Sequence, residues 1–463
     1  MQLPNRLSTP PFLQKLQWIA DPVKFMDNAV QQYPDIFTAE IVGFGDTVVF
    51  VNHPQGIQEI LNSDRNNFIA IGEANKVLRP VVGDYSILMM EREQHRRRRQ
   101  FLMPSFHGEK MRIYGELMCG LTEEVLSQLP QGKPFSAHAA MQEISLQVIL
   151  KAVLGLSGGE RCKKLKNLLP QMLLSLFHSS LTSTLLFFPF LQHNLGGWSP
   201  WAKFVHQRQE IGELLYAEIC ERRRQGNLNG VDILSLLISS KDKAGEGMTD
   251  FELRDELITL IVAGYETTAT AMAWGLYWIH QQLNVREKII AEIDSLDNVS
   301  DPMSIFRLPY LTAVCNESLR IHPITPFTFP RQVQETTQLL GNTLEPGMIV
   351  QGCIYLAHQR EDLYPQAKQF RPERFLEREF SLYEFLPFGG GARRCIGETL
   401  AIFEMKLVLA TILSRYQLEL VDKQPEKLKR RGPTLAPGNG VKMIITGQRE
   451  AQKSINMKTT AIL

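Results

Sequence analysis

The chain has 463 residues, with 50 basic and 49 acidic side chains and a net charge of +1. This balance excludes the dominant basic field of a general nucleic-acid binder. Six cysteines lie far apart without a Cys-x-x-Cys pair, which argues against a disulfide scaffold or a zinc site and favours reduced thiols in the cytoplasm.

Residues 1–21 contain charged side chains and two adjacent prolines, without an apolar run of about 20 residues or a signal-peptide core. We therefore expect no transmembrane anchor. No linker, repeat or low-complexity block divides the rest of the chain. The sequence predicts a lead-in over 1–35, one large domain over 36–447 and a polar tail over 448–463.

The next part of the chain predicts a hairpin, an irregular loop and an arginine-rich helix. Residues 36–52 are rich in β-branched and aromatic side chains, with a glycine-containing turn at 43–46. Residues 68–90 are mixed and irregular. Four arginines follow His95, and Arg99 shares its helix face at i+4. Such a run alone indicates either a solvated face or an anion-binding surface.

Helical periodicity dominates residues 117–156, which we interpret as core helices without chemistry. Residues 165–195 are crowded with Leu and Phe, and we expect Pro170 and Pro189 to interrupt them. Two interpretations stay open for this stretch. It is either a buried helix pair or an apolar lid over a lipophilic substrate channel that also touches a membrane surface.

A long helix is predicted from the capping box at Thr249–Glu252 to about Leu283. A glycine in its middle costs about 1 kcal/mol relative to alanine, which suggests a demand other than helix strength. Small side chains share one helix face there, and they leave a groove that could hold a flat group and its small ligand. These residues are Ala263, Gly264, Thr267 and Ala271.

Further along, Pro309 opens a helix that ends near His322. Glu317 and Arg320 stand at i and i+3 on it, a common surface pair by itself. A proline-stiffened segment leads into strand-like sequence over 331–356 and is expected to border a pocket. Residues 432–446 predict a hairpin that turns at Pro437-Gly438, and its tip is expected to reach the same pocket.

A glycine-rich loop over 387–397 contains Cys395 and precedes an apolar helical run over about 400–413. Backbone N–H groups at the start of that helix, with Arg393 two residues before the cysteine, favour a thiolate. An anionic axial ligand of haem iron needs such surroundings. The alternative is a buried structural cysteine.

The loop resembles the haem-binding signature of the cytochrome P-450 monooxygenases at five positions: Phe388, Gly391, Arg393, Cys395 and Gly397. Three further elements match that family in the same order, namely Ala263 to Thr267, Glu317 with Arg320, and Pro372 to Phe375. The resemblance covers about residues 36–447. It implies a mainly α-helical cytochrome P-450 fold with a small β-rich region, in one large domain of the soluble bacterial type.

The resemblance also implies roles for residues. Heme b (iron protoporphyrin IX) is its cofactor, with Cys395 as the iron ligand. Thr267 and Glu266 are the expected catalytic pair, a hydroxyl and an acid that deliver protons. The alternative is that the Thr267 hydroxyl bonds back to its own helix and that Glu266 forms an exposed ion pair. The other expected cofactor-binding residues are His95, Arg99, Arg331, Arg393, Phe388, Pro387, Gly389, Gly397, Ala263 and Gly264.

Two further groups of residues are predicted. The substrate pocket should include Phe327, Phe329, Leu260, Ala263 and Thr267. A buried charge network should join Glu317, Arg320 and Arg374, with a structural role, because removing one partner would leave an uncompensated charge.

The predicted function is the hydroxylation or epoxidation of a lipophilic substrate with O2. A long-chain fatty acid is the first candidate for this substrate, and a terpenoid is the second. Electrons would come from a separate ferredoxin and ferredoxin reductase, with the ferredoxin docking near Arg96–Arg98. A peroxide-using haem-thiolate enzyme and a non-catalytic haem-binding sensor stay open as alternatives.

Overall fold

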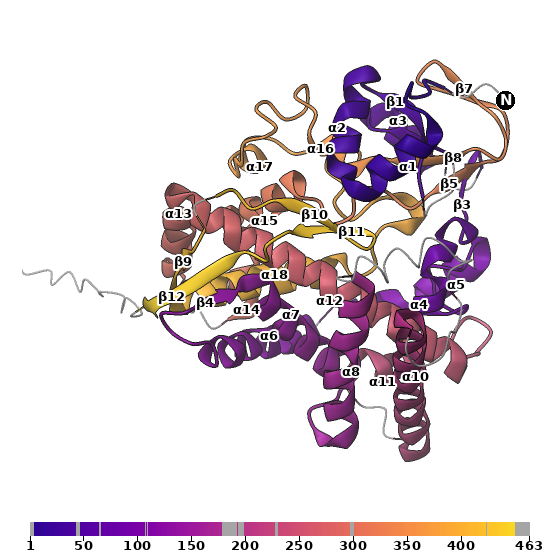
Figure 1. The fold of residues 1–463 in the computed structure, drawn as a ribbon. Coiled ribbons are helices and arrows are strands. Elements are labelled where there is room, and N and C mark those ends of the chain that lie inside the picture. The colour runs from indigo at the N-terminus through magenta and orange to yellow at the C-terminus, as the bar shows by residue number, and fades with distance from the viewer. Residues whose placement is uncertain are drawn as a thin grey trace, which may run out of the picture.

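The structure is a computed structural model, and it describes residues 4–42, 47–63, 66–106, 108, 110–177, 192, 199–226, 230–296, 301–422 and 424–449. Helices make up most of the molecule, and the small sheets lie among them, with β9 and β12 at the opposite end of the view from β3 and β8 (Figure 1). This confirms the predicted fold class of a mainly α protein with a small β-rich region.

The helices follow one another along the whole described chain. The α-helices are α1 (Pro11–Ala20), α2 (Pro22–Gln32), α3 (Pro54–Asn62), α4 (Arg79–Val82), α5 (Arg92–Leu102), α6 (Lys110–Ser127), α7 (Ala137–Val148), α8 (Gly159–Phe177), α10 (Pro200–Gln225), α11 (Ile233–Ser239), α12 (Asp250–Gln281), α13 (Leu283–Asp294), α14 (Pro302–Phe306), α15 (Pro309–Ile321), α16 (Ile354–His358), α17 (Arg374–Glu377) and α18 (Glu398–Arg415). The 3₁₀ helices are η1 (Glu73–Leu78), η2 (Met103–Phe106) and η5 (Gly391–Arg393), and η3 (Ile149–Val153) is a π-helical turn.

The strands within the described residues form four small sheets. The largest has the order β1-β2-β8-β5-β3, in which β2 and β8 run parallel and the other neighbours antiparallel. The other sheets have the orders β4-β12-β9, β10-β11 and β6-β7. The strands are β1 (Ile36–Glu40), β2 (Thr47–Val51), β3 (Phe68–Ala70), β4 (Pro134–Ser136), β5 (Arg331–Val333), β6 (Thr337–Leu339), β7 (Asn342–Leu344), β8 (Ile349–Gly352), β9 (Tyr416–Leu420), β10 (Leu428–Arg431), β11 (Thr434–Pro437) and β12 (Lys442–Gln448).

Helix α12 crosses the interior and packs against α7, α10, α15 and α18 (Figure 1). The predicted capping box is present, because Thr249 and Glu252 bond each other's backbone N–H groups. Its first half, up to Tyr265, belongs to one cluster of buried apolar side chains, and its second half, from Ala269, to another. The turn between these two halves carries the predicted catalytic residues.

The predicted lead-in is folded against the main sheet. Trp18 of α1 and Phe25 of α2 are buried, and the Trp18 ring lies 5.4 Å from that of Phe327 between ring centroids. Phe327 in turn contacts Phe50 of β2 at 4.8 Å. The packing of these aromatic rings therefore connects the N-terminal helices to one wall of the cavity described below.

Three predicted boundaries differ from the structure. Helix α8 continues through Pro170, because its buried face, which includes Leu165, Leu169 and Leu173, packs against α10 and offsets the lost backbone bond. The C-terminal hairpin turns between β10 and β11 and not at Pro437-Gly438. Residues 68–90, expected to be irregular, contain β3, η1 and α4.

Three other predictions fall wholly or partly outside the described residues: the turn at 43–46, the apolar stretch around Pro189, and the polar tail over 448–463. None of the helices that the structure describes combines the length and continuous hydrophobicity needed to cross a membrane.

Candidate active site

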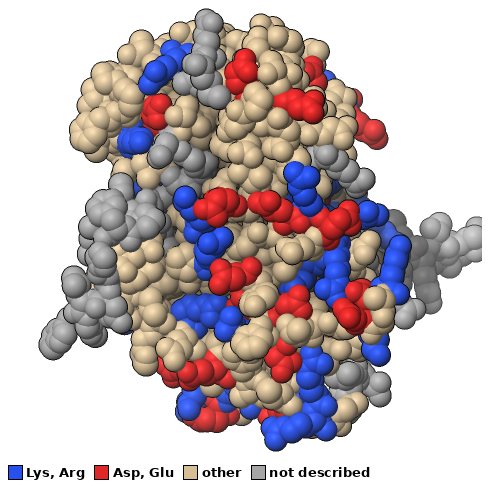
Figure 2. Space-filling view, turned by 90° about the vertical axis from the view of Figure 1, so that its right-hand side faces the viewer, with Lys and Arg blue, Asp and Glu red and all other residues tan. Residues whose placement is uncertain are grey.

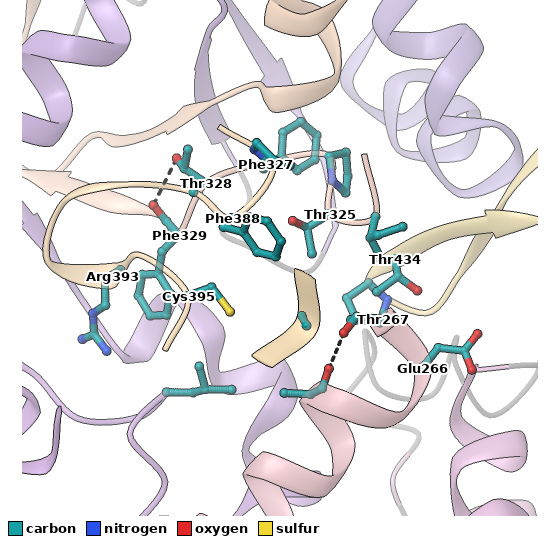
Figure 3. A pocket seen from close by; sticks show the side chains of 18 of the residues that line it. Glu266, Thr267, Thr325, Phe327, Thr328, Phe329, Phe388, Arg393, Cys395 and Thr434 are labelled. Atoms are coloured by element: carbon teal, nitrogen blue, oxygen red, sulfur yellow. Dashed lines mark hydrogen bonds between the residues drawn. The ribbon is translucent and has the colours of Figure 1, made fainter. Parts of the chain in front are cut away.

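A cavity of about 370 Å³ lies between the middle of α12 and the cysteine loop. Cys395 on the loop and Thr267 on α12 face it from different walls (Figure 3). Most of its lining is apolar. Besides α12 and the cysteine loop, the lining comes from η1 and α4, the prolines and phenylalanines before β5, and α18. The lining includes Leu78, Val81, Val82, Leu88, Ala263, Ala271, Ile324, Phe327, Phe329, Pro387, Phe388, Gly389 and Met405.

The cysteine loop takes its shape from backbone geometry. Gly389 and Gly391 have φ values of 67° and 65°, a left-handed conformation that favours glycine. The Cys395 N–H donates to the Phe388 carbonyl at 3.0 Å, which closes the loop. Gly397 then caps α18, so the cysteine stands just before the N-terminus of that helix.

The Cys395 side chain is exposed, but the space it faces is the cavity. Burial away from bulk water raises the pKa of its thiol, while a hydrogen bond from the Gly397 backbone and the charge of Arg99 lower it. The charge that lowers this pKa is that of Arg99 of α5, where the sequence suggested Arg393. Arg393 instead lies 4.3 Å above the Phe329 ring and donates to the carbonyls of Ile87 and Met90.

Four basic side chains from three segments gather beside the loop. Burial lowers the pKa of His95 to about 3, and the charges of Arg393, Arg99 and Arg331 lower it further. Arg331 is fully buried at the start of β5 and donates to the Gly390 carbonyl at 3.2 Å. A neutral imidazole among three guanidinium groups can offer hydrogen bonds and positive charge to carboxylates. These side chains therefore fit the two propionates of a haem.

The α12 face that meets the cavity carries Ala263, Thr267 and Ala271. The Thr267 hydroxyl donates back to the Ala263 carbonyl at 2.5 Å, which was the alternative considered for this residue. Gly264 faces elsewhere, because a Cβ added there would lie 3.5 Å from Ile149 of η3. One residue along a helix is a turn of about 100°, so Gly264 leaves the face of Ala263.

Leu260 differs from expectation, and Glu266 differs from the alternative considered for it. Leu260 is not among the described residues that line the cavity, and it packs against the apolar cluster around the first half of α12. Glu266 does border the cavity, but its side chain is buried and does not form an exposed pair. Gln142 donates to Glu266 Oε2 at 2.6 Å, and His138 Nε2 lies 3.3 Å from Oε1.

Sequence analysis missed this contribution from α7, which it treated as a helix without chemistry. His138 and Gln142 stand at i and i+4, so they form a polar face on a helix whose other buried residues are mostly apolar. That spacing was the available signal. It did not identify α12 as the partner, because the two helices are more than 100 residues apart in the sequence.

The predicted charge network is brought together and fully buried. Arg320 donates to both Glu317 oxygens at 2.7 and 2.8 Å, and Arg374 Nε donates to Oε1 at 3.1 Å. The Arg371 backbone N–H adds a fourth donor at 2.8 Å. All of these donors converge on one carboxylate.

The arginine run differs from the exposed surface expected of it. Arg98 is buried and pairs with Glu252 at 2.5 Å and Glu256 at 3.1 Å, while Arg97 pairs with Asp242 at 2.7 Å. Arg96 and Arg97 keep 59% and 42% of their side chains exposed, and among the described residues Arg96 pairs only with Glu93 of its own helix, at 3.5 Å. On the side that carries α5, acidic and basic side chains are interleaved (Figure 2).

A cysteine sulfur at one wall, a small-residue helix face at another and basic side chains beside the loop define a haem-thiolate type of site. The comparisons agree with this class. The family model described as Cytochrome P450 matches residues 4–443, so the chain belongs to the cytochrome P450 family. This membership implies haem b as the cofactor, haem-thiolate monooxygenase activity, and the use of O2 and redox partners.

Similar proteins support this assignment. Cytochrome P450 135B1 of Mycobacterium tuberculosis is 32% identical over 436 residues, which are 92% of this chain and 88% of the relative. Cytochrome P450 135A1 of the same species is 30% identical and covers 96% of both chains. In fold, the chain is similar to a retinoic acid bound cyanobacterial CYP120A1, with a TM-score of 0.83, 22% identity, and coverage of 96% of this chain and 100% of that one.

Proposed function

We propose that this haem-thiolate monooxygenase hydroxylates or epoxidises a lipophilic substrate. A long-chain fatty acid is the first candidate for this substrate, and a terpenoid is the second. Electrons for the reaction would come from a separate ferredoxin and ferredoxin reductase in the cytoplasm. The observation that supports a lipophilic substrate is the apolar lining of the cavity between Cys395 and Thr267. Burial of apolar surface there would supply most of the binding free energy, because the surface of the cavity is mainly apolar.

The proposed cofactor contacts follow from the geometry. Cys395 would ligate the iron, and its electron donation favours cleavage of O2 when haem is bound. His95, Arg99 and Arg331 would hold the propionates. Pro387, Phe388, Gly389, Arg393 and Gly397 would shape the loop side, and Ala263 the α12 side. Gly264, which faces Ile149 of η3, would not contact the cofactor directly.

Thr267 would act on protons at the cavity wall. Its hydroxyl bonds to the Ala263 carbonyl and can exchange this acceptor for a group in the cavity by rotating one side-chain bond. Glu266 would supply protons from behind that wall. Phe327 and Phe329 would form the apolar surface that orients the substrate.

The substrate proposal predicts a change in spin state. Long-chain fatty acids should convert the ferric protein from low to high spin as they displace water from the cavity, and terpenes should do so more weakly. Val82→Phe, which narrows the cavity, should weaken the response by about tenfold, the effect of about 1.4 kcal/mol. Leu382→Phe at the exposed surface should not. No spectral shift with any fatty acid would remove this substrate class.

The electron source gives a second prediction. Arg96→Glu should slow reduction by an acidic ferredoxin at low salt by about threefold to tenfold, because charge complementarity mainly sets association rates. Substrate affinity should not change. Arg112→Glu, at an exposed arginine on α6, is the control. Equal reduction rates in both variants would exclude docking at Arg96. Turnover with peroxide, and none with NADPH and a reductase pair, would favour the peroxide-using alternative.

A further inference from the structure

Behind the cavity wall, Glu266 belongs to a buried polar cluster built from three elements. Helix α7 contributes His138 and Gln142, α12 contributes Glu266 and Thr270, and β10 contributes Arg431. His138 lies at the centre of this cluster. Its Nε2 lies 3.1 Å from the Thr270 hydroxyl and 3.3 Å from Glu266 Oε1, while its Nδ1 lies 3.0 Å from Arg431 Nη1.

These contacts determine where the imidazole carries its proton. An arginine guanidinium only donates hydrogen bonds and is not deprotonated in proteins. Nδ1 of His138 must therefore accept from Arg431, so the ring proton stands on Nε2. This Nε2–H therefore donates to the Thr270 hydroxyl at 3.1 Å, and Glu266 Oε1 lies 3.3 Å from the same nitrogen. The second nitrogen of a histidine commonly sets the chemistry of the first in this way.

Both oxygens of Glu266 are contacted from this cluster. Gln142 donates to Oε2 at 2.6 Å, and His138 approaches Oε1, with Arg431 a further 4.0 Å from the same oxygen. The carboxylate accordingly extends away from Thr267 and Cys395 in Figure 3. An acid held in this way reaches the cavity only if it exchanges these donors for others.

We propose that His138, Gln142 and Arg431 are positioning residues that control when Glu266 delivers protons to the Thr267 side of the cavity. The inference rests on the proposed proton-supplying role of Glu266. Arg431 holds the His138 ring through Nδ1, Gln142 holds one oxygen of the Glu266 carboxylate by a hydrogen bond, and the His138 ring borders the other oxygen. Without this control, proton delivery to the Thr267 side of the cavity is no longer coupled to oxidation of the substrate. O2 then takes up the two electrons from NADPH and two protons and leaves as hydrogen peroxide.

The first test measures the tautomer and does not depend on turnover. In the reduced, carbon monoxide-bound holoenzyme with ¹⁵N-labelled histidine, His138 should show the Nε2–H form, assigned by its loss in His138→Gln. Arg431→Met should shift the ¹⁵N resonance of the unprotonated Nδ1, because this nitrogen loses its hydrogen-bond donor, whereas Arg431→Lys, which keeps a donor, should preserve the wild-type resonance. An unchanged Nδ1 resonance in Arg431→Met would overturn the proposal.

The second test measures peroxide released per NADPH oxidised with a surrogate reductase pair. Arg431→Met and Gln142→Leu should each raise this ratio at least threefold, and Arg431→Lys should restore it. Gln147→Leu is the matched control, because Gln147 also lies on α7 but bonds Glu143. A ratio equal to wild type in both test variants would refute the positioning role. If no variant oxidises NADPH at all, the proposed function fails while the tautomer result still stands.

Discussion

Replacing Cys395 with Ala is expected to abolish the thiolate spectrum of the reduced carbon monoxide complex. Cys395 is the only cysteine among the described residues that line the cavity. An alanine cannot donate electrons to iron, so any haem that stays bound would show the spectrum of a complex without thiolate. Difference spectra of the purified variant against wild type, at equal haem content, measure this loss.

The controls are two other accessible cysteines. Cys220 is exposed on α10, and Cys162 is half-buried on α8. Alanine at either position should leave the spectrum unchanged. A thiolate spectrum that persists in Cys395→Ala, or disappears in Cys162→Ala or Cys220→Ala, would contradict the assignment of the iron ligand.

The spacing of motifs located the cavity walls because local backbone geometry fixes them. Cys395 follows its glycines directly, and Thr267 follows Ala263 by one helical turn, so short-range rules suffice. Periodicity gives the relative angles of residues on a helix and not the width of the face that a cavity meets. Leu260 and Gly264 were therefore assigned to the cavity although they pack against other helices.

Charge partners could not be predicted in the same way. The run from Arg96 to Arg99 reads as one basic surface, but its side chains point in different directions around α5. Arg98 enters the interior to meet Glu256 of α12, and Arg99 reaches the cysteine loop, where it donates to the Arg394 carbonyl at 2.6 Å. These partners are separated by more than 150 residues, so only the tertiary fold selects them.

The second large effect is expected at the buried charge network. Glu317→Gln should lower the free energy of unfolding by about 3–5 kcal/mol, because Arg320 and Arg374 would keep their charges in the interior without a compensating carboxylate. Urea unfolding followed by circular dichroism measures the loss. Glu377→Gln is the control, because Glu377 pairs with Arg371 at the surface and should cost about 0–1 kcal/mol. Equal losses would contradict the structural role.

The same substitution should also reach the cysteine loop. Arg320 donates to the His358 carbonyl at 2.7 Å, and His358 Nε2 accepts from the Leu386 N–H at 3.0 Å, one residue before the loop begins. Burial lowers the pKa of His358 to about 3, with Arg320 adding to the effect, so the ring stays neutral and keeps this acceptor. In Glu317→Gln, the thiolate spectrum should therefore disappear at lower urea than the helical signal. Simultaneous loss of both signals would show that the network supports the fold without a separate effect on the loop.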